Sequence, residues 1–175
     1  MTIGGNFLDD TLFTLRRYKS LGEKSLAQLS NAQVHWKSDE AANSVAILVK
    51  HMAGNMRSRW TDFLRTDGEK PDRERDGEFI DDFESREQLM AVWEEGWQTC
   101  FSTLESLTDA DLAREVTIRG RAHTVVEAIN RQVGHYAYHV GQIVQLARIQ
   151  VGAAEWRSLS IPRGQSDAYD PEGRV

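Results

Sequence analysis

The chain has 175 residues, of which 40% are hydrophobic and 27% charged, and its formal net charge is -6. This length fits one domain, residues 1–175, with a composition typical of globular proteins. The acidic balance argues against a nucleic-acid-binding protein, which usually carries a basic stripe. No apolar run approaches the ~20 residues of a membrane helix, and the start lacks a secretory signal pattern, so we expect a cytoplasmic protein without a membrane partner.

Two amphipathic helices are predicted in the first part of the chain. The first has apolar or small residues at alternating spacings of four and three, which gives one stripe along a helix that only Lys19 interrupts. That stripe consists of Leu8, Leu12, Leu15, Gly22, Leu26 and Leu29. The second helix is predicted to begin after Ser44, a residue type favoured at helix N-caps, and to continue to about Phe63.

Two further helices are predicted from capping boxes, in which an N-cap hydroxyl and the side chain three residues later satisfy each other's free amides. The third helix opens with Ser85 and Gln88, and its apolar positions include Cys100. A lone cysteine in such a pattern is predicted to be a buried, unreactive thiol. The fourth helix opens with Thr124 and Glu127 and runs to about residue 151.

The connections complete an all-α fold class, a four-helix bundle with one long crossover. Residues 66–84 contain Pro71 and a dense mixed-charge run, so we expect a surface crossover that lets the middle helices run in parallel. Residues 115–123 alternate around Gly120 and predict a small β-hairpin before the fourth helix. Residues 153–175 lose periodicity and form an irregular C-terminal tail.

Three histidines carry the strongest chemical signal. His135 and His139 lie one helical turn apart on the inward face, so both imidazoles can reach one ion. An isolated pair of this spacing more often hydrogen-bonds to neighbouring groups, but His51 adds a third imidazole on the apolar face of the second helix. Three imidazoles suit zinc, nickel, copper or ferrous iron and leave coordination positions open. His35 and His123 lie near turns and are predicted to make only local contacts.

Two familiar metal sites are excluded by the neighbouring residues. A zinc peptidase of the His-Glu-x-x-His type needs a glutamate after its first histidine, and Tyr136 occupies that place. A di-iron carboxylate bundle needs Glu-x-x-His pairs, and the sequence contains none.

The segments His51-Met52-Ala53-Gly54-Asn55 and HYAYHVGQ, residues 135–142, together with the order of the helices, resemble the DinB-like superfamily of metal-binding bundles over most of the chain. The resemblance implies up-down-down-up topology, a homodimer, and one divalent ion, zinc, nickel, iron or manganese, held by His51, His135 and His139. Relatives include transferases that use the thiols bacillithiol, mycothiol or glutathione, and a maleylpyruvate isomerase. The resemblance therefore implies a low-molecular-weight thiol as a second cofactor.

Two hypotheses for function remain open. The first is a metal-dependent thiol S-transferase or related enzyme acting on a small molecule. Its candidate ligand-binding residues are Asn55, Arg59 and Gln142 near the histidines, and Arg163, whose guanidinium could hold a carboxylate if the tail folds back. For each of these residues a purely structural or solvent-exposed role is the alternative. The second hypothesis is a metal-dependent binding or stress-response protein without catalysis, because no acid/base pair can be identified and the catalytic residues are unknown.

Overall fold

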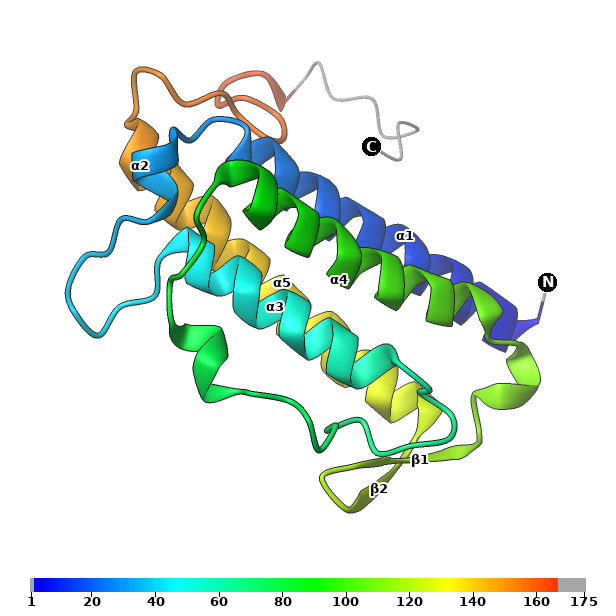
Figure 1. The fold of residues 1–175 in the computed structure, drawn as a ribbon. Helices are drawn as coiled ribbons and strands as arrows, with labels where there is room; N and C mark the ends of the chain where they lie inside the picture. The colour runs from blue at the N-terminus through cyan, green and yellow to red at the C-terminus, as the bar shows by residue number, and fades with distance from the viewer. Residues whose placement is uncertain (1, 167–175) are drawn as a thin grey trace.

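The computed structural model describes residues 2–166, which are mostly helical and include one antiparallel hairpin (Figure 1). The long helices are α1 (Ile3–Leu26), α3 (Val45–Trp60), α4 (Arg86–Ser106) and α5 (Val125–Val151). The short elements are α2 (Asn31–Val34), the 3-10 helices η1 (Asp76–Phe79) and η2 (Asp109–Asp111), and the strands β1 (Glu115–Ile118) and β2 (Arg121–Thr124).

The four long helices lie side by side, and α3 and α4 run in one direction while α1 and α5 run in the other (Figure 1). The most extensive contacts join α3 to α4 and α1 to α5, and α3 also packs against α5. The histidines predicted to act together lie on α3 and α5. The packing of these two helices therefore decides whether the imidazoles can meet.

The predicted starts of two long helices are confirmed at their caps. The Ser44 hydroxyl accepts a hydrogen bond from the Ile47 amide at 3.1 Å and opens α3. At α5 the capping box is complete, because Thr124 Oγ1 accepts from the Glu127 amide and the Glu127 carboxylate accepts from the Thr124 amide at 2.7 Å. Both caps satisfy amides that the first helical turn leaves without a partner.

The predicted box at α4 forms only in part. The Ser85 hydroxyl accepts from the Gln88 amide at 3.2 Å, as expected. The Gln88 side chain, however, accepts from the amide of Glu84 at 2.8 Å rather than from that of Ser85. Ser85 has a φ of -153°, more extended than the -74° of Ser44.

Aromatic side chains fill the core between α3, α4 and α5. Trp60, Trp93 and Trp97 are each 1% exposed or less, and Trp97 packs edge-on against the fully buried ring of Tyr136, with centroids 5.6 Å apart. Rings of this size bury large apolar areas, and their edge-to-face contacts add to the stabilisation. Cys100 lies in the same core, as predicted, and burial raises the pKa of its thiol.

The predicted hairpin is confirmed, and it is fastened to the crossover. Strands β1 and β2 pair antiparallel, and the turn at Arg119 and Gly120 has positive φ angles of 53° and 72°. Two consecutive positive φ angles are characteristic of the tight hairpin turn that favours glycine. The Asp67 carboxylate accepts hydrogen bonds from both turn amides, at 2.9 Å and 2.8 Å, and so links the crossover to the hairpin.

The tail that follows α5 packs against the segment just after α1, as far as the tail is described. The backbone amide of Arg157 donates to Gln28 Oε1 at 2.7 Å, and Gln28 Nε2 donates to the Arg157 carbonyl at 3.1 Å. Trp156 is partly buried against the core. Residues 167–175 of the predicted tail lie outside the described residues.

Among the described helices, none is both long enough and apolar enough to cross a membrane.

The close approach of α3 and α4 depends on Gly96. A Cβ at this position would lie 2.8 Å from the backbone Cα of Ala53, so Gly96→Ala is expected to lower the free energy of unfolding by about 1–3 kcal/mol. Gly134 on α5 is the matched control, because a Cβ there meets nothing within 4 Å. Gly134→Ala should raise stability by about 0.5–1 kcal/mol through helix propensity. Denaturant unfolding measures both, and equal effects of the two substitutions would contradict the packing argument.

Candidate metal centre and adjoining cavity

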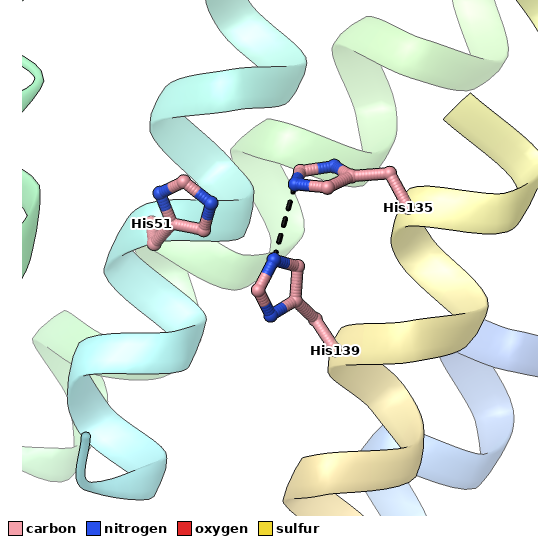
Figure 2. Close-up of side chains that lie close together, drawn as sticks. All are labelled: His51, His135 and His139. Atoms are coloured by element: carbon pink, nitrogen blue, oxygen red, sulfur yellow. Dashed lines mark hydrogen bonds between the residues drawn. The ribbon is translucent and has the colours of Figure 1, made fainter. Parts of the chain in front are cut away.

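Helices α3 and α5 bring three imidazoles together. His51 on α3 faces His135 and His139 on α5, and one ligand atom from each lies within 4.8 Å of the others (Figure 2). His51 is 5% exposed and His139 is 9% exposed, so the group lies mostly within the protein. These three residues could hold a metal ion, as the sequence indicated.

The distance between two of the nitrogens fits an ion. His135 Nε2 and His139 Nε2 are 3.1 Å apart. Two nitrogens bound to one ion at about 2.0–2.1 Å, with a bond angle of about 90–109°, lie about 2.9–3.4 Å apart. The ligand atoms of all three histidines lie within 4.8 Å of one another. Because this spacing is wider than that around a bound ion, the imidazoles would have to move slightly closer together to bind one.

The orientation of His51 is fixed by a carboxylate from the crossover. His51 Nδ1 lies 2.9 Å from Glu78 Oε2, and both side chains are less than a tenth exposed. Glu78 is held in turn by Arg73, whose Nε donates to Oε1 at 2.7 Å and whose Nη2 donates to Oε2 at 2.8 Å. Carboxylates that hold the second nitrogen of a ligand histidine are common around metal ions, because they set the ring's tautomer and raise its basicity.

The charge of Glu78 is stabilised although it is buried. Burial alone raises the pKa of a carboxyl group, but hydrogen bonds from His51 and Arg73 outweigh it and hold the pKa of Glu78 below its ordinary value. The absence of a side chain at Gly54, one turn of α3 from His51, leaves room for this carboxylate, because a Cβ there would overlap it. Gly54 therefore allows η1 to pack closely on α3.

The two histidines of α5 differ in their second nitrogens. His139 Nδ1 lies 2.8 Å from Gln142 Oε1, one turn along the same helix. His135 Nδ1 is buried and has no hydrogen-bond partner among the described residues. Burial, with the nearby charges of the other two histidines, lowers the pKa of His135 to about 3, and burial also lowers the pKa of His139. Both rings are therefore neutral at pH 7, the state that binds a metal.

A cavity of about 320 Å³ adjoins this group. Its lining consists of His51, Asn55, Arg59, Arg73, Arg75, Arg119, Arg131, Gln132 and His135. The edges of two of the three candidate ligands thus face one space, where a small molecule could approach an ion. A cavity of this size is at the lower end of those that bind small molecules.

The four residues predicted to bind a ligand occupy different places. Asn55 and Arg59 line the cavity, each one further turn along α3 from His51. Gln142 instead contacts His139. Arg163 is exposed in the turn at residues 162–165 and does not line the cavity.

Asn55 also belongs to a buried hydrogen-bonded chain. Trp60 Nε1 donates to the Tyr136 hydroxyl at 2.9 Å, and that hydroxyl donates to Asn55 Oδ1 at 3.2 Å. The aromatic core therefore fixes a side chain of the cavity wall. Asn55 is thus part of a polar network and also lines the cavity, and its contact with a ligand stays a prediction.

The remaining histidines lie outside the three-histidine group, as predicted, but only His123 makes a local contact, whereas the exposed His35 pairs with the crossover. His35 Nδ1 lies 2.9 Å from the carboxylate of Asp81, and His123 Nδ1 lies 2.9 Å from the carbonyl of Arg121. Neither belongs to the three-histidine group.

The prediction of a surface crossover is wrong for two of its residues, which are buried against the site. Arg73 and Glu78 have side chains only 4% and 8% exposed. Their charges are neutralised by each other and by Glu69, whose carboxylate accepts from Arg73 Nη1 at 3.1 Å. The mixed charges that indicated a solvated loop are the groups that allow this segment to be buried.

Sequence reasoning therefore missed six side chains of the site, Arg73, Arg75, Glu78, Arg119, Arg131 and Gln132. Arg73 and Glu78 lie in a segment without periodicity, where spacing does not distinguish a buried charge from a solvated one. Gln132 precedes His135 by three positions on the inward face of α5, and this spacing could have identified it.

The fold and the site define the class of the protein, a mostly helical chain with a three-histidine group that could hold a metal ion. The chain belongs to the family described as "Protein of unknown function (DUF1572)", whose model matches residues 2–165. No curated protein matches the chain, and no solved structure matches it.

The role of Glu78 can be tested by removing its charge. Glu78→Gln keeps the size of the side chain but weakens its bonds to His51 and Arg73, so metal affinity is expected to fall by about 10–100-fold. Glu74→Gln is the control, since Glu74 is exposed in the same crossover. Competition with a chromophoric chelator measures both affinities. An unchanged affinity in Glu78→Gln would show that this carboxylate does not orient a metal ligand.

Proposed function

We propose that the protein binds one divalent metal ion through His51, His135 and His139 and uses it to act on a small molecule in the adjoining cavity. The observation that carries this proposal is the meeting of three imidazoles beside a cavity lined by polar groups. When bound, zinc, nickel, iron or manganese would lower the pKa of a coordinated thiol or water and make it a nucleophile at neutral pH.

The reaction class that fits best is a thiol S-transfer or a related reaction. Three imidazoles leave positions of the ion open to a low-molecular-weight thiol. Around those positions Glu78 orients His51, Gln142 orients His139, and the apolar core holds Asn55 at the cavity wall. Asn55 and Arg59 are proposed to bind the second substrate, because both line the cavity.

The wider proposals follow from the resemblance to DinB-like proteins. The helix directions in Figure 1 support a single four-helix-bundle domain of up-down-down-up topology, spanning residues 1–175. We further propose a cytoplasmic homodimer. The exposed position of Arg163 gives no support for its predicted contact with the ligand.

A second candidate function is metal-dependent binding, including a stress-response role, without catalysis. It is favoured by one observation: among the described residues, no carboxylate lines the cavity. Glu78 is engaged with His51 and Arg73, and Glu127 with its helix cap. A reaction here would thus take its base from the ion or from the substrate, whereas a binding protein needs none.

Metal content is expected to distinguish the three histidines of the proposed site from His35 and His123. Wild-type protein is expected to hold about one divalent ion per chain, and His51→Ala, His135→Ala or His139→Ala should each lower metal affinity by at least about tenfold, because each removes one of three ligands. His35→Ala and His123→Ala are the controls. Elemental analysis after exhaustive dialysis measures occupancy. Equal metal content in all five variants would exclude the proposed site.

Thiol binding distinguishes the transferase from the binding protein. Cobalt-substituted protein titrated with a small thiol is expected to gain a thiolate-to-cobalt absorption band, because soft thiolates bind the metals that imidazoles select. His139→Ala, compared at the same cobalt loading, should weaken or lose the band. If the wild-type protein holds cobalt and shows no band at saturating thiol, the transferase function is excluded and the binding function is retained.

A further inference from the structure

We propose that the cavity is built for a small molecule that carries a phosphate or carboxylate group, with this group among the arginines and the rest of the molecule toward His51 and His135. The five arginines that line the cavity are Arg59, Arg73, Arg75, Arg119 and Arg131. Within residues 2–166, no acidic side chain lines it. A positive cavity in a chain of formal net charge -6 is a local feature that the overall composition does not produce.

The positive charge is only partly compensated from outside the cavity. Glu69 pairs with Arg73 and Arg119, and Glu78 pairs with Arg73, so the five arginines have two acidic partners at hydrogen-bonding distance. Arg131 on α5 forms no salt bridge within the described part of the chain. The remaining positive charge faces the cavity, where an oxyanion would bind at several donors.

Arg59 is the strongest indication of a missing anionic partner. It is 3% exposed, and its Nε and Nη1 atoms are buried without a hydrogen-bond partner in the described residues. The nearest carboxylate oxygen, on Glu69, lies 3.9 Å from Nη2, beyond hydrogen-bonding distance. A buried guanidinium that has lost its water and gained no acceptor is costly to the fold, and an oxyanion in the cavity would offset that cost.

The other cavity residues define the rest of the ligand. Gln132 Oε1 is buried and has no hydrogen-bond partner among the described residues, so it can accept from a hydroxyl or N–H group of the ligand. The volume of about 320 Å³ corresponds to roughly ten water molecules. This is the size of a small metabolite rather than of a peptide or a nucleic acid. This inference rests on the proposed function only for the orientation of the ligand, because that function places the reacting end of the ligand at the metal.

Direct titration of the full-length protein tests the cavity apart from the metal. Inorganic phosphate and succinate are added separately to metal-free and to zinc-loaded protein, with chloride holding the ionic strength constant, and calorimetry measures the dissociation constants. At least one of these oxyanions is expected to bind metal-free protein with a stoichiometry of one. Arg59→Gln and Arg131→Gln should each weaken it by about 10–100-fold, because each removes a charged donor. The tighter of the two probes identifies the preferred group.

Control variants distinguish a loss of oxyanion binding from a loss of folding. Arg148→Gln removes an exposed arginine from the same helix as Arg131 but outside the cavity, and it should leave the affinity unchanged. Arg131 is also exposed, so its variant should fold even if Arg59→Gln does not. Failure of both probes to bind metal-free protein, or equal affinities for wild type and Arg131→Gln, would overturn the inference while the metal site still stands. Oxyanion binding that persists when His135→Ala abolishes metal binding would support the inference independently of the proposed function.

Discussion

The hydrogen bond between His51 and Glu78 is the constraint on which the site depends. His51 can share an ion with two side chains from another helix only if its ring is held at one angle, and the carboxylate 2.9 Å from Nδ1 sets that angle. A buried carboxylate is tolerated only when its charge is satisfied, and Arg73 supplies that compensation through two hydrogen bonds. The crossover that carries both residues must therefore pack against α3. Gly54 makes this packing possible.

The same packing explains which parts of the site the sequence could predict. His51, Asn55 and Arg59 share one face of α3 by simple helical spacing, and His135 and His139 do so on α5. Local periodicity was therefore sufficient for the histidine group, for the helix starts at Ser44 and Thr124, and for the hairpin. These features depend on contacts between residues close in sequence or on an apolar stripe.

The features that sequence reasoning missed depend on the crossover folding back over α3. Nothing in the spacing of Glu69, Glu74 and Glu78 shows which carboxylate will be buried, because that choice is made by tertiary packing against His51. The burial of Arg59 has the same cause, since the crossover covers a face that would otherwise be solvated, as the hydrogen bond from Ser58 to the Gly68 carbonyl illustrates. A mixed-charge segment is therefore predicted to be a solvated loop as long as the side chains that pair with its charges in the fold are unknown.

The charges at the three-histidine group and in the cavity lie close enough to affect each other. Imidazole ligands bring no negative charge, so the nearest compensation for a divalent ion at the histidines would be Glu78, which is already shared with Arg73. An ion at the histidines would therefore raise a positive potential that Arg59 and Arg131 already create. An oxyanion in the cavity lowers the repulsion between the two sets of charges. Because coupling between two binding sites is reciprocal, an oxyanion that binds more tightly in the presence of the metal must strengthen metal binding by the same factor. If both proposed sites are occupied, the cavity and the histidine group would form one thermodynamic unit, in which the ligand would help to retain the ion at which it reacts.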